Sequence, residues 1–284
     1  MLVNLKEILK IAEERSVAIG CFNGPDLTSI KAVIKAAEEL NQPVCLTHAQ
    51  LHEEKGLCTM EEIAPIMLMF AKKASVPVCV HLDHGTDLNY IKRGLELGFT
   101  SVMYDGSELE LEENIKNTKL VVEMSKAYGA SVEAELGSMG ARGGGFGGAT
   151  TVSKDDTRVS IYTEPDVAEY FVKETGVDAL ACAFGTAHGF YSSAPKLDFE
   201  RVSAIREAIN KLPIVMHGGS GVSKEDYYEV IKRGVRKVNY YTYMAKAGGA
   251  AVSNKEYSQF HDVLIDAEKA IKENVMEAIK IFSE

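Results

Sequence analysis

Three of the seven histidines stand next to a glycine, and each follows a different apolar run. They are His84, His188 and His217, and the fold must bring them together before they can act as a group. Three neutral imidazoles that leave one coordination position open form a typical catalytic zinc site. The spacing alone also permits a second interpretation, in which they are separate histidines that hydrogen-bond within one site.

Carboxylates accompany these histidines. Asp83 directly precedes His84, and alternation along a strand would send the two side chains to opposite faces. Both can reach one site only if the strand ends between them. Asp83 is then placed for general acid–base catalysis, or it orients a histidine ligand. Glu133 and Glu135 share one strand face, so they either reach a metal and its ligands or need buried partners.

A glycine-rich turn with a hydroxyl follows His217. Glycines let backbone N–H groups approach a phosphate closely, and a serine adds a donor. The residues that we expect to bind phosphate and the adjoining substrate are Gly218, Gly219 and Ser220, together with Asn239, Tyr240, Tyr241 and Thr242. The alternative interpretation of the glycine segment is an ordinary tight turn.

Lysine chemistry has no obvious place in this pattern. The run from Ala179 to Gly185 contains no lysine, and we expect Lys237 to open the last strand, at the end away from the site. A Schiff-base mechanism therefore lacks a nucleophile where one is needed, which favours a metal as the electrophile.

The elements that must position these residues are eight short apolar runs of strand length. They begin at Ala18, Pro43, Pro77, Ser101, Ser131, Ala179, Pro213 and Lys237. Amphipathic segments such as 27–40, 111–128 and 202–212 lie between them. This alternation predicts a (β/α)8 TIM barrel, with a doubly wound open sheet as the alternative. Residues 257–283 add one or two helices after the barrel.

A barrel places its active site at the carboxyl ends of the strands. Polar residues occur at these ends, including Asn23, His48, Asp105 and Glu135 as well as the three histidines. A purely structural barrel would not need them. His52 gives no such signal. The glycine-rich segment 137–163 is too long for an ordinary connection and is expected to be a functional loop.

Composition limits the partners. The net charge of −10 argues against a nucleic-acid binder. The longest apolar stretch has nine residues, well short of the roughly 20 of a membrane span. Five scattered cysteines without a CxxC motif are typical of reduced thiols. We therefore expect a cytoplasmic protein. We also expect a single domain, residues 1–284.

Seven short motifs along the chain together resemble the class II, zinc-dependent ketose-bisphosphate aldolases, which include fructose- and tagatose-1,6-bisphosphate aldolases. The matching motifs are FN at Phe22, HLDHG at His81, SVMYDGS at Ser101, SVEAELG at Ser131, GTAHGFY at Gly185, HGGSG at His217 and KVN at Lys237. They occur in order along nearly the whole chain, and in combination they are highly specific.

The resemblance implies a role for each matching position. His84, His188 and His217 would hold zinc, and Asp83 would be the acid–base residue at the aldehyde oxygen. Asp105 and Glu135 would hold a second divalent cation or a monovalent cation. Gly189, the turn 218–220 and the strand end 239–242 would contact phosphate and dihydroxyacetone, and Asn23 joins this set. A homodimer or homotetramer is expected.

The implied reaction is reversible cleavage of a phosphorylated ketose to dihydroxyacetone phosphate and an aldehyde. The second proton transfer needs an acid on the loop after the fifth strand, and here the candidates are displaced to Asp155 or Asp156. His48 is the alternative for this step. Two other functions remain open, a metal-dependent hydrolase and an inactive sugar-phosphate binder.

Overall fold

The computed structural model describes residues 1–137, 141–142, 162–189 and 194–284. Eight parallel strands of these ranges close into a barrel, because β11 pairs with β2 and β4 pairs with β5. In spatial order the strands are β2 (Ile19–Asn23), β3 (Val44–Ala49), β4 (Val78–Gly85), β5 (Ser101–Tyr104), β6 (Ser131–Leu136), β8 (Ala179–Cys182), β10 (Ile214–Met216) and β11 (Val235–Tyr240). This confirms the predicted barrel. An open sheet would leave two strand edges unpaired.

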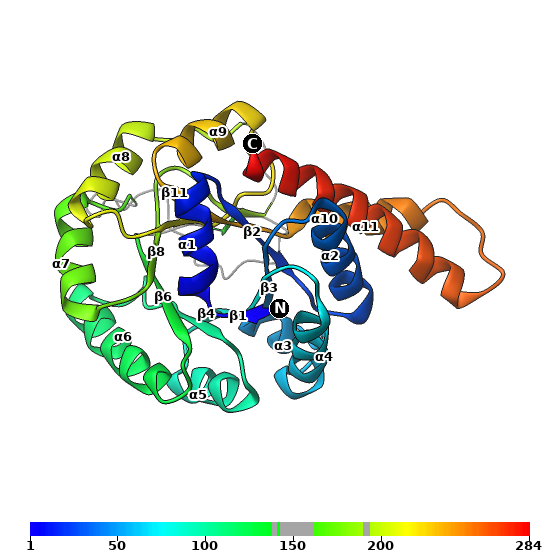
Figure 1. Ribbon diagram of the computed structural model, residues 1–284, viewed down its shortest axis with the longest axis horizontal. Coiled ribbons are helices and arrows are strands. Elements are labelled where there is room, and N and C mark those ends of the chain that lie inside the picture. Colours follow the sequence, from blue (N-terminus) through cyan, green and yellow to red (C-terminus); the bar gives the residue numbers. More distant parts are fainter. Residues whose placement is uncertain (138–140, 143–161, 190–193) are drawn as a thin grey trace.

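Helices surround the barrel (Figure 1). They are α1 (Leu5–Arg15), α2 (Leu27–Leu40), α3 (Gln50–Glu54), α4 (Met60–Lys73), α5 (Leu88–Leu97), α6 (Leu111–Lys126), α7 (Pro165–Thr175), α8 (Phe199–Ala208), α9 (Lys224–Lys232), α10 (Thr242–Val252) and α11 (Phe260–Ser283). Three short strands complete the described elements: β1 (Leu2–Val3) beside β4, and the pair β7 (Ala141–Arg142) and β9 (His188–Gly189).

Capping residues explain where the helices begin and end. The predicted helix 27–40 is confirmed, because Asp26 accepts from the Ser29 N–H at its start and Asn41 adopts a left-handed conformation at its end. The bounds predicted for 202–212 are wrong. That helix begins earlier, where the Asp198 side chain accepts from the N–H of Arg201, and it ends at Ala208.

The barrel interior is closed at one end by α1. Leu5, Ile8 and Leu9 of this helix form a buried cluster with small inward residues of the strands, such as Cys45 and Ala181. Figure 1 shows α1 lying across this end of the barrel. The polar groups of the interior therefore gather at the opposite end, where the strands have their carboxyl ends.

The C-terminal segment forms one long helix in the structure. Its final turns pack on the barrel through Val275, Ile279 and Phe282, and Figure 1 shows its beginning, together with the end of α10, extending beyond the barrel. Within the described ranges, no helix has the length and apolar content needed to cross a membrane.

Candidate active site

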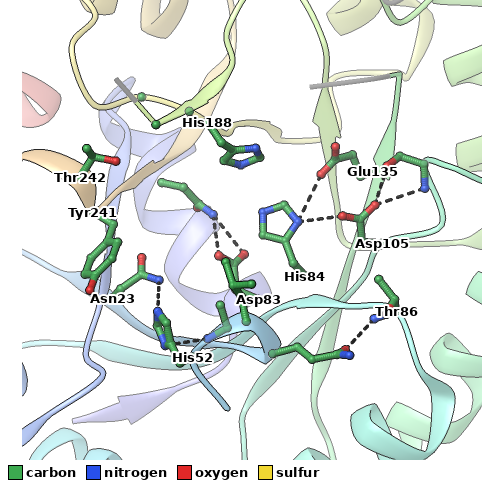
Figure 2. A pocket seen from close by; sticks show the side chains of 18 of the residues that line it. Asn23, His52, Asp83, His84, Thr86, Asp105, Glu135, His188, Tyr241 and Thr242 are labelled. Carbon is green, nitrogen blue, oxygen red and sulfur yellow. Dashed lines mark hydrogen bonds and ion pairs between the residues drawn. The ribbon is translucent and has the colours of Figure 1, made fainter. Parts of the chain in front are cut away.

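A cavity of about 290 Å³ opens at the carboxyl ends of the strands (Figure 2). This volume is at the lower end of the roughly 300–1,000 Å³ of ligand pockets, which suits a small substrate. Nearly all of the predicted site residues line it: Asn23, Asp83, His84, Asp105, Glu135, His188, Gly189, Gly218, Gly219, Ser220, Asn239, Tyr240, Tyr241 and Thr242. His217 lies fully buried directly below and contacts His84.

Asp83 and His84 both reach this pocket, for a reason that the sequence did not indicate. The expectation that the strand ends between them is wrong, because β4 continues to Gly85. The pairing register of β4 with β5 instead shifts between Leu82 and Gly85, and His84 has a φ of +48°. An irregularity of this kind redirects a side chain at the rim of a barrel. A left-handed non-glycine residue costs about 1–3 kcal/mol, a strain that clusters at functional sites.

The three glycine-flanked histidines come together as predicted. Their nearest ligand nitrogens lie within 4.8 Å of one another, and Nε2 of His84 is 2.8 Å from Nδ1 of His217. Both ring nitrogens of His188 are buried and have no hydrogen-bond partner among the described residues. Burial, followed by the neighbouring His84 and His217, lowers the pKa of His188 to about 3, so this imidazole is neutral. An uncharged imidazole with unpartnered nitrogens fits a metal ligand, and three imidazoles suit zinc.

Carboxylates surround His84 on the other side (Figure 2). Its Nδ1 lies 2.8 Å from Oδ2 of Asp105, whose Oδ1 in turn accepts a hydrogen bond of 2.6 Å from the Ser107 hydroxyl. Although burial alone lowers the pKa of His84, Asp83 and then Asp105 raise it to about 10. In this arrangement Asp105 orients the imidazole and supports its binding of a proton or a cation.

Glu135 completes a second candidate group with His84 and Asp105, whose ligand atoms also lie within 4.8 Å of one another. Oε2 of Glu135 is buried, has no hydrogen-bond partner within the described ranges, and lies 3.8 Å from Nδ1 of His84. Burial and then Asp105 raise the pKa of Glu135 well above its usual range. A cation beside the oxygens of Glu135 and Asp105 would give Oε2 of Glu135 a partner. It would also stabilise the ionised form of Glu135.

Asp83 is held by an amide from the opposite side of the barrel. Nδ2 of Asn239 donates to both of its carboxylate oxygens, at 3.1 Å each. Burial raises the pKa of Asp83, but the charge on His84 and the other nearby donors outweigh it and hold this pKa well below the usual range. Asp83 is therefore ionised and can accept a proton.

The barrel interior below these groups contains Lys237, and the position predicted for this lysine is wrong. Lys237 does not open the last strand, because β11 already begins at Val235. Its side chain points inward, is 0% exposed, and lies 2.9 Å from Oε2 of Glu133. Glu133 also accepts from Nε2 of His217 at 2.9 Å. The signal was available, since Lys237 stands two residues before Asn239 and shares its strand face.

Backbone groups and hydroxyls form the opposite wall. Gly218 has a φ of +63°, and a Cβ atom there would lie 2.5 Å from the carbonyl oxygen of Ala187. The Ser220 hydroxyl accepts from the N–H of Tyr241, where α10 begins without a side-chain cap. None of the described lining residues is lysine or arginine. On this wall an anion would therefore be bound by N–H groups, hydroxyls and the amino end of α10.

The aromatic residues of this wall differ in orientation. Tyr240 lines the pocket, but its ring packs edge-on against Phe22 and Phe282, at centroid distances of 6.0 and 6.1 Å. Tyr241 and His52 lie together at the far side of the pocket, with ring centroids 5.7 Å apart (Figure 2).

Two histidines differ from their expected positions relative to the pocket. His48 is fully buried, lies 3.1 Å from the Tyr90 hydroxyl, and is not among the described residues that line the pocket. His52 lines it instead, with Nε2 3.1 Å from Nδ2 of Asn23. The missed signal was the position of His52 one helical turn after a strand-end histidine. Asp155 and Asp156 lie outside the described residues.

The chain is similar to known proteins in both sequence and fold. The family model described as "Fructose-bisphosphate aldolase class-II" matches residues 3–284. This chain belongs to the class II fructose-bisphosphate aldolase family. A fructose-bisphosphate aldolase of Staphylococcus aureus is 36% identical over 290 residues, which cover 99% of this chain and 97% of that protein.

A second relative of this class II aldolase is YdjI of Escherichia coli K12. Its sequence is named an uncharacterized protein and is 36% identical over 282 residues, 99% of this chain and 98% of YdjI. The crystal structure of the YdjI aldolase has a TM-score of 0.86 at 35% identity and covers 99% of this chain and 97% of that one. The predicted family and barrel are therefore confirmed.

Proposed function

We propose that this class II aldolase uses zinc to cleave a phosphorylated ketose reversibly into dihydroxyacetone phosphate and an aldehyde. The ketose is fructose- or tagatose-1,6-bisphosphate or a related sugar phosphate. The observation that carries the proposal is the ionised Asp83 beside a cluster of three histidines, one of which has no partner for either ring nitrogen among the residues that the structure describes.

His84, His188 and His217 would hold the zinc ion. When bound, zinc supplies a Lewis acid that polarises the ketose carbonyl. Asp105 and Glu135 would add oxygen ligands for a second divalent or a monovalent cation, and the unpartnered Oε2 of Glu135 supports this position. Asp105 also fixes the orientation of the His84 ring.

The residues of the chain move the protons. In the cleavage direction, Asp83 takes the proton from the hydroxyl on the aldehyde side of the scissile carbon–carbon bond. The electron pair of that bond passes to the dihydroxyacetone phosphate fragment and forms its enediolate. The Asn239 amide donates hydrogen bonds in this part of the site and stabilises the developing negative charge. Protonation of the enediolate carbon by a second acid completes the reaction.

The phosphate of this fragment would lie against Gly189, the turn 218–220 and the strand end 239–242. The amino end of α10, which has no side-chain cap, supports this position, because a helix start presents backbone N–H groups to an anion. Gly189 and Gly218 have positive φ angles and no side chain, which lets the backbone approach a ligand closely. Asn23 would bind the sugar from the other side, held by His52.

The test is a panel of phosphorylated ketoses incubated with the zinc-loaded protein, with dihydroxyacetone phosphate measured by a coupled reduction. Release of this product from at least one ketose by the wild type, and its near absence with Asp83→Ala, supports the proposal. Release of an acid or an alcohol instead would identify a metal-dependent hydrolase. Tight binding of sugar phosphates without turnover would identify an inactive binder.

We also propose that residues 1–284 act as a single domain that assembles into a homodimer or homotetramer. The start of α11 extends from the barrel and exposes Phe260, Leu264 and Ile265, which is apolar surface suited to a partner. Sedimentation of the wild type and of Ile265→Glu tests this assembly. All five cysteines are free thiols, four of them buried, which supports a cytoplasmic location.

A further inference from the structure

The proposed chemistry gives no role to Lys237, a charged residue beneath the site. Lys237 lies in the middle of β11, is 0% exposed, and is not among the described residues that line the pocket. Its Nζ lies 2.8 Å from Oδ1 of Asn239 and 2.9 Å from Oε2 of Glu133. It is therefore close to the groups that act on the substrate but separated from the substrate itself.

An ammonium group in the interior of a barrel is costly. Removing it from water costs several kcal/mol, and a well-packed apolar side chain would fill the same space without that cost. Glu133 provides the opposite charge, and this carboxylate also accepts from His217. Charge balance alone does not require the pair, since two apolar residues would also be neutral. The polar contacts that Lys237 makes thus identify what it contributes.

The contact with Asn239 has a direction. An ammonium group has hydrogens to donate and no acceptor, so it binds the carbonyl oxygen of an amide and not its NH2 group. With Oδ1 directed at Lys237, Nδ2 of Asn239 faces the Asp83 carboxylate, at 3.1 Å from each oxygen. A flipped amide would place its oxygen against that carboxylate and its NH2 group against the ammonium, so both contacts would become repulsive.

We propose that Lys237 is a positioning residue for the aldol reaction: it holds the Asn239 amide in the one orientation that donates to Asp83 and to the substrate. Glu133 makes the buried ammonium tolerable and links it to His217. This inference rests on the proposed function, because it assigns Lys237 to the reaction in which Asp83 and Asn239 take part.

The experiment is a double-mutant cycle on zinc-loaded, full-length protein with the best ketose phosphate of the panel. Lys237→Met is expected to lower kcat about tenfold to a hundredfold, the usual effect of a misplaced catalytic group. KM should change by less than about threefold, since Lys237 does not reach the pocket surface. When Lys237→Met is added to the Asn239→Leu variant, kcat should fall by less than about a further twofold. The amide that Lys237 orients is already absent from that variant.

A second pair of variants covers the case in which Lys237→Met does not fold with Glu133 unpaired. Glu133→Gln is compared with Glu133→Gln/Lys237→Met, in which both charges are removed, and kcat should again fall about tenfold or more between them. Rates are expressed per folded, zinc-containing chain. Lys116→Met serves as the matched control, because Lys116 is exposed on α6 and pairs with Glu113.

The outcomes separate the inference from the function on which it rests. If the wild type releases no dihydroxyacetone phosphate from any ketose of the panel, the proposed function is overturned. With an active wild type, equal losses from Lys237→Met in the presence and absence of the Asn239 side chain overturn the positioning role. So does a loss that disappears once rates are corrected for folded, zinc-containing protein.

Discussion

Nδ1 of His84 lies 2.8 Å from Oδ2 of Asp105, and this contact decides which nitrogen of the ring faces the other histidines. Nε2 is the nitrogen that remains, and it lies 2.8 Å from Nδ1 of His217. Asp105 is itself fixed by the backbone N–H and hydroxyl of Ser107. The chain Ser107–Asp105–His84 therefore presets one imidazole for a ligand in the centre of the cluster.

Asp105→Asn should weaken zinc binding about 10- to 100-fold, the usual effect of losing a carboxylate behind a histidine ligand. The amide would no longer favour the proton on Nδ1 of His84 as strongly. Zinc titration of the metal-free protein, followed by calorimetry, measures the change. Asp166→Asn, an exposed acid in the first turn of α7, is the control. An affinity equal to that of the wild type would show that Asp105 does not support the site.

His188→Ala should abolish stable zinc binding and turnover together, because its two ring nitrogens have no other partner in the described part of the chain. Metal analysis of the purified protein is expected to find about one zinc ion per chain in the wild type and far less in the variant. His261→Ala, whose side chain is 66% exposed on α11, should keep both. A protein that remains fully active after chelation would contradict the zinc site.

Asp83→Ala should lower kcat by about 10² to 10⁴, the range for loss of a general acid–base group. Zinc content should stay close to that of the wild type, since Asp83 is not one of the proposed ligands. Rate and metal content are measured on the same preparation. If zinc is lost while the chains that retain it turn over normally, Asp83 supports the metal and does not transfer the proton.

The sequence predicted the barrel because its strands are buried on both faces and appear as continuous apolar runs. It predicted the histidine cluster because all three residues follow such runs, where a barrel gathers its site. The shared reach of Asp83 and His84 could not be predicted, since it depends on a register shift between two strands. No local pattern of residues determines that shift.

Lys237 and His52 were missed for a different reason. A lysine is ordinarily assigned to the surface, and only the strand face that it shares with Asn239 indicates otherwise. The assignment of His48 to the pocket failed because the short helix α3 carries His52 into it, while His48 packs behind with Tyr90. The errors for Lys237 and for His48 and His52 both concern the direction in which a polar side chain points. Tertiary packing decides that direction.

The stability of the protein should depend on His48 below neutral pH. Burial lowers the pKa of His48 to about 4, whereas the pKa of a histidine in an unfolded chain is about 6.5. The unfolded state therefore binds more protons in this window, and the free energy of unfolding falls as the pH falls from about 6.5 to 4. The full loss from this one group is about 3 kcal/mol.

Urea unfolding of the metal-free protein at pH 7 and pH 4.5 measures this effect. His48→Gln should lose less stability than the wild type between the two pH values, because glutamine does not titrate. His261→Gln, an exposed histidine, should keep the pH dependence of the wild type. An equal pH dependence in His48→Gln would show that other groups cause the loss.

The second proton transfer is the step for which we propose Asp155 or Asp156. Exchange of solvent hydrogen at C1 of dihydroxyacetone phosphate isolates this step from bond cleavage. Asp155→Asn combined with Asp156→Asn should slow the exchange more than about tenfold and leave zinc bound, as expected for loss of a general acid–base group. His48→Gln should leave it unchanged, because the structure does not bring His48 to the pocket. If the exchange is normal in the double variant and slow in His52→Ala, the proton is transferred from α3 and not from the loop.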